Sequence, residues 1–497
     1  MLRAAEGEDA VENESYDLIV IGAGPAGEKG AAQAAYFGKR VAIIERDRVG
    51  GAVTNTGTLP SKTLQETAAH IAQAKDRDDR GLPFKLNADI TVEDLFRRQR
   101  EVVRAHLGVV NENIKRHNID LISGAARIEG PRSVSVTPAA GAPRMLDAAF
   151  ILIATGSRPL RPPEIPFDGE YVYDSDSVLQ MKRIPQSMVV VGGGAIGCEY
   201  ASLFAAVGVR VTLVDSRDRL LPFIDGELTA VLERQMRARG VDVVYRRRLR
   251  GVDVRTGGRE VRVTLDDGGA LVAEALLFAA GRSANTEGLG LAEAGIALSA
   301  SGTVAVDEHY RTSVPTIYAA GDVIGFPALA STSMEQARVA VCHAFGFEYK
   351  RQVSSLIPYG LFTIPPISTL GASEEELIAA GEPYLVGRTA YRTNPRAQIG
   401  GDTTGLVKLL FSPADRRLLG VGIVGDGASE LVHLGQACMH FGGTIDFFID
   451  SVFNFPTLSD AYKYAAYDGL GKLRQYEEEQ AGRTAAVPVG KEGGAGT

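Results

Sequence analysis

The chain has 497 residues, of which 45% are hydrophobic, and a formal net charge of −8. That length is too great for one ordinary core and predicts about three domains. The acidic balance argues against a nucleic-acid partner or an anionic membrane surface, and no apolar run is long enough to span a bilayer.

The first predicted element is a strand over residues 16–21, which follows a polar stretch of 15 residues that we expect to be unstructured. The strand runs into Gly22-x-Gly24-x-x-Gly27, an alanine-rich helix, and a second strand that ends at Glu45. In such a fingerprint the glycines allow a tight turn, a close approach of backbone to a pyrophosphate, and close packing of the helix on the strand. The helix amides then face the phosphates, and the carboxylate of Glu45 can accept ribose hydroxyls.

Helical patterns follow at residues 61–75 and 92–117, and short strands then lead to the sequence ATGSRP at residues 154–159. The first pattern then recurs: a strand at residues 188–191 precedes Gly192-x-Gly194-x-x-Gly197 and a second alanine-rich helix. A strand–turn–helix–strand unit of this kind belongs to a doubly wound sheet. The chain therefore contains two dinucleotide-binding units.

The strand after the second fingerprint ends at Asp215, 23 positions after Gly192, just as Glu45 lies 23 positions after Gly22. An acid at this place favours the free 2′-hydroxyl of NAD and would repel the 2′-phosphate of NADP. Arg217 and Arg219 follow at once and could offset that repulsion, although they could equally be solvated charges in a turn. The sequence thus supports NAD and leaves NADP open.

Two dinucleotide sites in one chain indicate a relay, in which one site holds a flavin and the other exchanges a nicotinamide nucleotide. In the sequence TIYAAGDVIG, Asp322 at a strand end can bind a ribityl hydroxyl, although an Asp that caps a helix would look similar. From about residue 352 the chain alternates strands, at 406–411 and 418–425, with helices near 430–440 and 460–473. This alternation of strands and helices is typical of an α+β domain. We expect the last 20 or so residues to be unstructured.

The cysteines and histidines of the sequence do not indicate a metal site. Three cysteines, Cys198, Cys342 and Cys438, lack the spacing of a disulfide framework, an iron–sulfur cluster or a zinc site. Seven histidines show no paired metal-ligand spacing. The N-terminus lacks the apolar stretch of a signal peptide, so we expect a cytoplasmic protein.

With these motifs in this order, the chain resembles the pyridine nucleotide-disulfide oxidoreductase family over residues 16–475. The resemblance rests on GAGPAG, the loop of residues 50–62, ATGSRP, GGGAIGCEY, AAGRSAN, AAGDVIG, FTIPPIS and FPTLSDAY. It implies an α/β chain with two doubly wound domains, for FAD and for NAD(H) or NADP(H), and a C-terminal α+β domain that forms a homodimer or a higher homo-oligomer. The predicted boundaries are a tail at 1–15, the FAD domain at 16–157 and 285–350, the NAD(P) domain at 158–284, the dimerisation domain at 351–475 and a tail at 476–497.

The resemblance also implies the site residues. Lys62 would lie beside the flavin N5 and pair with Glu199, and these two are the predicted catalytic residues. A cation near N5 favours the anionic reduced flavin, and a carboxylate holds the ammonium in place. The predicted cofactor contacts are Gly22, Gly24, Pro25, Ala26, Gly27, Glu45, Arg46, Gly50, Gly51, Thr54, Lys62, Ala126, Thr155, Gly156, Gly321 and Asp322, together with Gly192, Gly194, Ala195, Ile196, Glu199, Asp215, Ser216, Gly281 and Arg282.

The family's disulfide reductases carry two cysteines in the loop of residues 50–62 and a histidine before a Pro-Thr pair. Here the cysteine positions hold Val53 and Thr58, and Phe455 precedes Pro456-Thr457; the glutamate that serves the histidine matches Asp460. Valine and phenylalanine cannot exchange disulfides or move protons. The joint loss of the thiols and their base indicates a different reaction.

Hydride transfer between nicotinamide nucleotides needs none of the missing groups. Within the family, the chain most resembles the soluble pyridine nucleotide transhydrogenases, which share the threonine of the GTxPSK sequence and the aromatic residue before Pro-Thr, although they often keep a cysteine where Val53 stands. We therefore predict a ping-pong, Si-specific transhydrogenase that moves hydride from NADPH to NAD+ through flavin N5. The alternatives are an NAD(P)H dehydrogenase that reduces a quinone or another small acceptor, and a non-catalytic flavoprotein that binds NAD(P)H.

Overall fold

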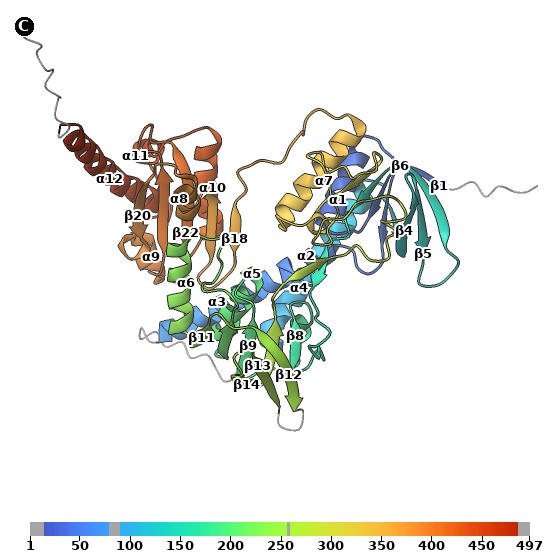
Figure 1. The fold of residues 1–497 in the computed structure, drawn as a ribbon, viewed down its shortest axis with the longest axis horizontal. Coiled ribbons are helices and arrows are strands. Elements are labelled where there is room, and N and C mark those ends of the chain that lie inside the picture. Colours follow the sequence, from blue (N-terminus) through green and yellow to red (C-terminus); the bar gives the residue numbers. More distant parts are fainter. Residues whose placement is uncertain (1–13, 79–89, 256–258, 486–497) are drawn as a thin grey trace, which may run out of the picture. The chain divides into compact units, whose positions relative to one another are not determined.

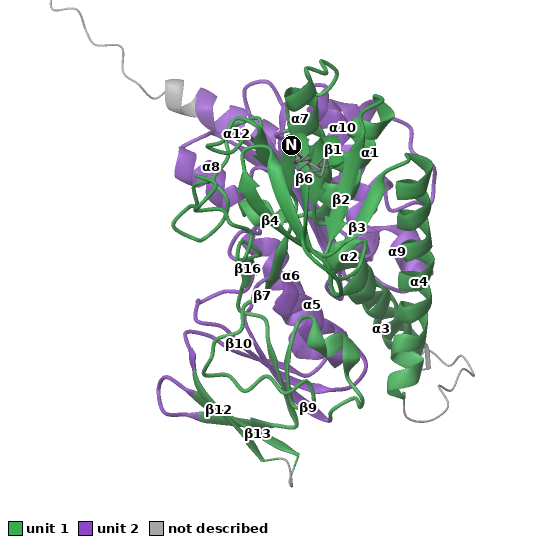
Figure 2. Cartoon of the chain, turned by 90° about the vertical axis from the view of Figure 1, so that its right-hand side faces the viewer, with its two compact units in different colours: residues 1–185, 250–264, 270–354 green, residues 186–249, 265–269, 355–497 purple. Residues whose placement is uncertain are grey.

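The computed structural model describes residues 14–78, 90–255 and 259–485. Its elements are labelled in Figure 1. The chain divides into two compact units, coloured in Figure 2: unit 1 comprises residues 1–185, 250–264 and 270–354, and unit 2 comprises residues 186–249, 265–269 and 355–497.

Unit 1 is built on a seven-stranded sheet of order β3-β2-β1-β6-β5-β4, with β17 paired to β6. The central strand β1 runs parallel to β2 and β6, whereas β4, β5 and β6 are antiparallel neighbours. Residues 18–21 of β1 are buried, as expected of a parallel strand covered on both faces. The strands are β1 (Glu14–Ile21), β2 (Val41–Glu45), β3 (Asp120–Ser123), β4 (Ala125–Gly130), β5 (Ser133–Thr137), β6 (Arg144–Ile153) and β17 (Ile317–Ala319).

Helices α1 (Pro25–Tyr36) and α7 (Ala330–Phe345) pack against each other on small residues, since a Cβ added at Gly30 would lie 3.3 Å from the Cβ of Ala337. The helices predicted at 61–75 and 92–117 are confirmed as α3 (Thr58–Asp78) and α4 (Val92–Arg116). The other elements of unit 1 are α2 (Gly51–Asn55), η1 (Ser177–Gln180), η3 (Asp322–Ile324), the paired strands β7 (Ser157–Pro159) and β16 (Arg282–Ala284), the paired strands β8 (Val172–Asp174) and β15 (Ala275–Phe278), and the sheet of β12 (Leu249–Arg255), β13 (Glu260–Leu265) and β14 (Ala270–Ala273).

Unit 2 contains the second fingerprint and the C-terminal sheet. Strands β9 (Ser187–Val191), β10 (Arg210–Val214) and β11 (Val241–Val244) are parallel, with helices α5 (Ala195–Ala206) and α6 (Gly226–Ala238) between them in the chain. The C-terminal sheet has the order β18-β19-β22-β21-β20 and is antiparallel. These strands are β18 (Tyr359–Leu361), β19 (Ile367–Gly371), β20 (Leu385–Ala390), β21 (Leu406–Phe411) and β22 (Leu418–Val424).

The C-terminal sheet is covered by the long helix α12 (Asp460–Ala485), which approaches β20 so closely that a Cβ at Gly387 would lie 2.1 Å from the carbonyl oxygen of Ala465. The ring of Tyr462, near the start of α12, stacks on the ring of Phe448 with the ring centroids 4.8 Å apart. The sequence places a strand–helix alternation here, and the α+β class is confirmed. The remaining helices are α8 (Glu374–Ala380), η4 (Tyr391–Thr393), α9 (Pro395–Gly400), α10 (Ala428–His440) and α11 (Asp446–Asp450).

The end of the last helix differs from the sequence prediction. Helix α12 continues to Ala485, although an unstructured tail was predicted from residue 476; residues 474–485 are rich in helix formers, and Arg474 pairs with Glu478 one turn later at 2.9 Å. Most of the tail predicted at 1–15 lies outside the described residues. The compact units group residues 158–185 with the first fingerprint and residues 186–249 with the C-terminal sheet. The division into FAD, NAD(P) and dimerisation domains stays a prediction.

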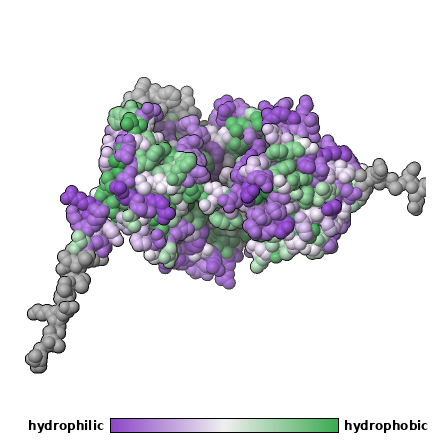
Figure 3. Space-filling model, turned by 90° about the horizontal axis from the view of Figure 1, so that it is seen from above, coloured by the Kyte–Doolittle hydropathy of each residue, from purple (hydrophilic) through white to green (hydrophobic). Residues whose placement is uncertain are grey.

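The surface of the protein is mixed in hydropathy. Hydrophilic and hydrophobic residues are interspersed on the face drawn in Figure 3. Among the described residues, no helix is both long and apolar enough to cross a membrane.

Candidate dinucleotide-binding sites

The first fingerprint makes a tight turn between β1 and α1. Gly22 has φ +103°, and a Cβ there would lie 2.5 Å from the carbonyl oxygen of Ala154. A Cβ at Gly27 would lie 1.9 Å from the carbonyl oxygen of Gly22, so only glycine allows this packing. At Gly24, by contrast, the one described heavy atom within 4 Å of an added Cβ is the Cα of Gly51 at 3.8 Å. The backbone is therefore open where a pyrophosphate would approach.

The first turn of α1 leaves its amides available. Gly24 is the N-cap residue and provides no capping side chain, and Pro25 occupies the first position of the helix. Ala26 and Gly27 follow and are buried. Uncapped amides at a helix N-terminus suit an anionic ligand.

Glu45 lies beside this turn. Its Oε2 accepts the amide of Ala23 at 2.7 Å, and its Oε1 accepts the amide of Asp47 at 2.8 Å. The side chain of Arg46 donates to Asp47 at 3.3 Å. The carbonyl oxygen of Glu45 accepts the amide of Gly124 at 3.0 Å, which holds the residue directly before β4, the strand that contains Ala126, at the end of β2.

The loop of residues 50–62 lies against the fingerprint. The amide of Gly50 donates to the carbonyl of Ala23 at 2.8 Å, and a Cβ at Gly51, which has φ +55°, would lie 2.7 Å from the Cα of Gly24. Thr54 is buried. The structure therefore brings the predicted residues Gly50, Gly51 and Thr54 together with the first fingerprint.

The two positions that hold cysteines in disulfide reductases lie on either side of a turn that hydrogen bonds close. Val53 is in α2, and Thr58 is the first residue of α3. Between them, the amides of Thr56 and Gly57 both donate to the carbonyl of Ala52, at 3.0 and 2.6 Å. Backbone hydrogen bonds therefore fix the shape of this loop without a disulfide between positions 53 and 58.

Asp322 is held by the ATGSRP and GRSAN segments. Its Oδ2 accepts the hydroxyl of Ser157 at 2.7 Å, and Arg282 donates its Nε to the same hydroxyl at 2.8 Å. The hydroxyl of Thr155 donates to the carbonyl of Asn285 at 2.7 Å. Three segments that are far apart in the sequence therefore meet around one carboxylate.

This cluster adjoins the N-terminus of α1. Gly321 has φ +83°, and a Cβ there would lie 3.2 Å from the Cβ of Ala26. Gly156, with φ +68°, has no described heavy atom within 4 Å of an added Cβ; Gly281, with φ +145°, meets only the side chain of Leu160. The open backbone at Gly24 and Gly156, the uncapped helix and the two carboxylates fit FAD.

The second fingerprint, in unit 2, repeats this geometry. Gly192 has φ +110°, and a Cβ at Gly197 would lie 1.7 Å from the carbonyl oxygen of Gly192. Gly194, again an N-cap without a capping side chain, has no described heavy atom within 4 Å of an added Cβ. Ala195 and Ile196 open helix α5. The N-terminus of α5 therefore suits a second pyrophosphate.

Asp215 is almost completely enclosed, with an exposed fraction of 4%. It accepts the amide of Gly193, and it accepts three hydrogen bonds from Arg217, one from the backbone and two from the guanidinium. Burial alone would raise the pKa of the Asp215 carboxyl, but these hydrogen bonds hold it below its usual value. Of the two arginines weighed from the sequence, Arg217 pairs with Asp215, whereas Arg219 pairs with Glu375 at 2.9 Å. Ser216 is exposed.

The predicted catalytic residues lie on separate units. Lys62 is in α3 of unit 1, and Glu199 is in α5 of unit 2. Glu199 accepts the amide of Phe362 at 2.9 Å, and three residues on, Ser202 accepts the amide of Ile364 at 3.1 Å. These bonds fix α5 to the FTIPPIS segment. The ion pair between Lys62 and Glu199 stays a prediction.

The FPTLSDAY segment has Phe455 where the family's disulfide reductases carry the histidine that serves their dithiol. Phe455 is 69% exposed. Asp460 is buried at the start of α12, and its Oδ2 has no hydrogen-bond partner among the described residues. All three cysteines are free and buried, and burial raises the pKa of the Cys438 thiol to about 11. Thiolate chemistry has no support at these positions.

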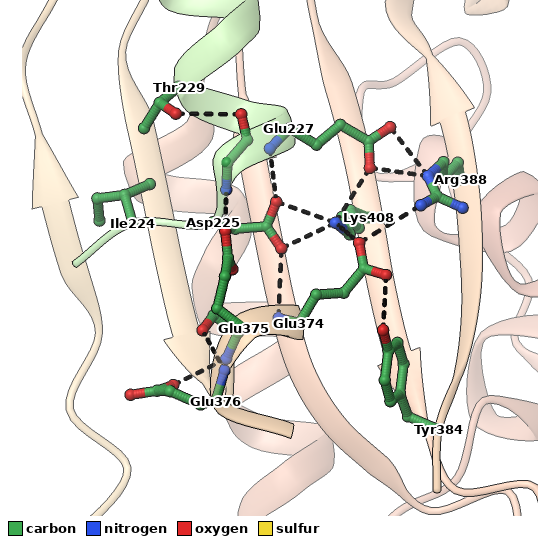
Figure 4. A network of polar contacts seen from close by, with 12 residues as sticks. Ile224, Asp225, Glu227, Thr229, Glu374, Glu375, Glu376, Tyr384, Arg388 and Lys408 are labelled. Carbon is green, nitrogen blue, oxygen red and sulfur yellow. Dashed lines mark hydrogen bonds and ion pairs between the residues drawn. The ribbon is translucent and has the colours of Figure 1, made fainter. Parts of the chain in front are cut away.

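Sequence reasoning missed Lys408, which is buried in unit 2 among three carboxylates (Figure 4). Its ammonium donates to both oxygens of Asp225 at 2.8 and 2.9 Å and forms ion pairs with Glu227 and Glu374. Arg388 also pairs with Glu227, at 2.8 Å. Carboxylates this close could hold a metal ion, but cations of the chain already occupy their centre. The one signal in the sequence is a lysine within the apolar strand LVKLLF.

Comparisons with known proteins agree with this architecture. Residues 16–344 match the model of the pyridine nucleotide-disulphide oxidoreductase family, and residues 357–466 match that family's dimerisation domain. The soluble pyridine nucleotide transhydrogenase of Mycobacterium bovis is 44% identical over 92% of this chain and 98% of its own length. That of Hahella chejuensis is 40% identical over 92% of this chain and 99% of its own length.

Solved structures give the same result. LpdA from Mycobacterium tuberculosis superimposes with a TM-score of 0.84 at 29% identity, over 90% of this chain and 99% of that one. The HOCl-induced flavoprotein disulfide reductase RclA from Escherichia coli gives a TM-score of 0.83 at 27% identity, over 91% of this chain and 99% of that one. The chain belongs to the pyridine nucleotide-disulphide oxidoreductase family.

Proposed function

We propose that this protein is an FAD-dependent pyridine nucleotide transhydrogenase, which transfers hydride from NADPH to NAD+ by a ping-pong route. The observation that carries the proposal is that both dinucleotide fingerprints are complete, whereas Val53, Thr58 and Phe455 replace the groups needed to pass electrons to sulfur. The relatives named soluble pyridine nucleotide transhydrogenase support it at 40–44% identity over 92% of the chain.

The chain's own residues would hold the cofactor. The backbone amides of Gly24, Ala26 and Gly27 would bind the pyrophosphate of FAD, because they are hydrogen-bond donors at a helix N-terminus. Glu45 would accept hydroxyls of the adenosine ribose, and Asp322 a hydroxyl of the ribityl chain. When bound, FAD supplies a group that accepts a hydride from one nicotinamide nucleotide and returns it to another. The buried Thr54 and the packed loop of residues 50–62 would exclude water from that group.

Lys62 and Glu199 would act as a pair. The lysine would place a positive charge where negative charge develops, and Glu199 would hold the ammonium in position. The bond from Phe362 already fixes one oxygen of Glu199, which restricts where this carboxylate can point. The nicotinamide nucleotide would bind at Gly194–Ile196, with Asp215, Arg217 and Ser216 at its ribose end.

We further propose that the protein acts as a homodimer in the cytoplasm, where its nucleotides are found. Residues 357–466 match a dimerisation domain. In the same region Phe441, Val452 and Phe455 expose 86%, 96% and 69% of their surface. Apolar side chains this exposed are typical of a surface that a second copy covers. Sedimentation of the purified protein would give the state directly, and a monomer would refute this part of the proposal.

Anaerobic titration tests the function. The FAD-loaded protein is mixed with NADPH and with NADH separately, and the flavin absorbance is followed. The proposal predicts that both nucleotides bleach the flavin and that added NAD+ restores the oxidised spectrum. Bleaching by one nucleotide without recovery on NAD+ would favour a dehydrogenase with another acceptor, and no bleaching would leave a binding protein.

A further inference from the structure

A cavity of about 400 Å³ lies in unit 2, between helix α6 and the C-terminal sheet. Helix α6 packs closely on this sheet, since a Cβ added at Gly422 of β22 would lie 2.6 Å from Cδ1 of Leu228. The helix forms one wall of the cavity, and the end of β20, the helix η4 and the start of β21 form the other. A volume of this size is typical of sites for small molecules. The lining contains no residue of either fingerprint or of the loop of residues 50–62, so this cavity is separate from the sites described above.

Two arginines line the cavity from different elements, Arg234 from α6 and Arg392 from η4. Within the described ranges, neither guanidinium forms an ion pair or a hydrogen bond. On the same helix, by contrast, Arg237 pairs with Glu233 at 2.8 Å. Arg234 has alanines at positions 230 and 238, where an acid one turn away would have paired with it. The cavity therefore carries two positive charges that the described chain does not neutralise.

The one acid in the lining, Glu227, is already paired (Figure 4). Arg388 donates its Nε to both oxygens of Glu227, at 2.8 and 2.9 Å, and Nζ of Lys408 lies 3.0 Å from Oε2. Close by in the sequence, Asp402 accepts the amide of Thr404 at 3.0 Å and so shapes the loop before β21. The two arginines therefore remain the charged groups of the lining that can attract a ligand, and that ligand is an anion.

The rest of the lining offers hydrogen-bond donors and an aliphatic surface. Thr403 and Thr404 carry hydroxyls and Gln235 carries an amide, groups that can donate to the oxygens of an anion. The aliphatic part of the lining is Ala230, Val231, Ala390 and Leu406. A cavity with a few polar groups and an aliphatic wall suits an organic anion better than a simple inorganic one.

We propose that this cavity binds a small phosphorylated organic molecule, whose phosphate is held by Arg234 and Arg392 and whose organic part packs on the aliphatic lining. Guanidinium groups bind phosphates through paired, charge-assisted hydrogen bonds. A phosphate monoester carries close to two negative charges at neutral pH, which matches the two arginines. Because α6 and the C-terminal sheet both contribute to the cavity, a bound ligand stabilises their contact and hence unit 2. The inference does not depend on the proposed transhydrogenase function.

The first test uses phenyl phosphate as the ligand and calorimetry on the FAD-loaded full chain, with excess NAD+ present to occupy the second fingerprint. In the double variant Arg234→Gln with Arg392→Gln, the Kd of phenyl phosphate should rise about tenfold or more. The control, Arg237→Gln with Arg396→Gln, removes the same charge from α6 and from the segment after η4, outside the lining. It should change the Kd by less than about threefold. An unchanged Kd in the first variant, or an equal loss in the control, would overturn the proposal.

A second variant keeps the charges and removes the space. Ala230 is an exposed residue of α6, and Ala230→Phe would fill the cavity from that wall. Phenyl phosphate should then bind about tenfold more weakly or worse, and an unchanged Kd would show that it binds elsewhere. This variant decides the question if the double arginine variant does not retain FAD.

Inorganic phosphate tests the role of the aliphatic lining, because it carries the charge without the organic part. In the wild type it should bind more weakly than phenyl phosphate, and phenyl phosphate should raise the apparent Tm. Equal affinity for the two ligands would contradict the assignment to an organic phosphate. None of these ligands carries a hydride, so a protein without transhydrogenase turnover would refute the proposed function and leave this binding result as it stands.

Discussion

The side chains at positions 53, 58 and 455 decide which reactions this protein can carry out. Val53 and Phe455 offer neither a nucleophile nor a proton, and the hydroxyl of Thr58 does not undergo thiol–disulfide exchange. The three free cysteines are buried, and burial raises the pKa of each thiol. No residue along the described chain is therefore in place to pass electrons to a disulfide. Lys62, which stands four positions after Thr58, does not depend on those groups.

Lys62→Ala tests the role proposed for this residue. If the ammonium stabilises negative charge that develops on the reduced flavin, the substitution should slow flavin reduction by about 100-fold or more while FAD stays bound. Stopped-flow mixing with NADPH gives the rate, and the absorbance ratio of flavin to protein gives the FAD content. Lys472→Ala, at an exposed lysine of α12, is the control. Parallel loss of rate and FAD would indicate a structural role instead.

The helices and strands of unit 2 are joined by buried charges that connect distant parts of the sequence. Asp225 is the N-cap of α6 and accepts the ammonium of Lys408 from β21, while Glu374, which opens α8, accepts the same group. Glu375, the next residue of α8, accepts the amide of Gly226 at 2.8 Å. The start of α6 is thereby fixed to β21 and α8.

We predict that Lys408→Met destabilises unit 2 by about 3–5 kcal/mol, because it leaves three carboxylates close together without their central cation. Differential scanning fluorimetry of the FAD-loaded protein should show a lower apparent Tm. Lys472→Met, at an exposed position, should leave the Tm unchanged. Equal Tm values for Lys408→Met and the wild type would mean that the network adds nothing to stability.

The same network predicts a dependence of stability on pH. Burial would raise the pKa of Glu227, but hydrogen bonds from Arg388 and Lys408 hold it below its usual value. A carboxyl whose pKa falls on folding contributes stability above its unfolded pKa and loses it as the pH drops through the folded value. Below about pH 4 the Tm of the wild type should therefore fall more steeply than that of Lys408→Met. Superimposable profiles from pH 7 to pH 3 would contradict this.

The sequence predicts the elements better than it predicts the side-chain pairings. Both fingerprints, their acids and most strands and helices follow from local patterns, because glycine turns and apolar periodicity are properties of short segments. The partners of Lys408 are 34 to 183 positions away, and those of Arg219 include Glu375, 156 positions away. Such pairings depend on how strands and helices come together, which no local pattern encodes. For the same reason the sequence left open which arginine faces Asp215.

In the whole chain, two units each carry one complete dinucleotide fingerprint, and the regions that match the family models extend from residue 16 to residue 466. Transfer of a hydride from a nicotinamide nucleotide to a flavin requires two dinucleotide sites, whereas a protein that only binds a nucleotide needs one.

The central claim is that the final hydride acceptor is a second nicotinamide nucleotide. The most direct test is the ratio of kcat/KM for thio-NAD+ to kcat/KM for a benzoquinone, with NADPH as the donor and FAD-loaded wild-type protein. The proposed function predicts that thio-NAD+ is the better acceptor and that varying both substrates gives the parallel lines of a ping-pong mechanism. If the quinone were preferred by orders of magnitude, the protein would be an NAD(P)H dehydrogenase and the transhydrogenase assignment would be wrong.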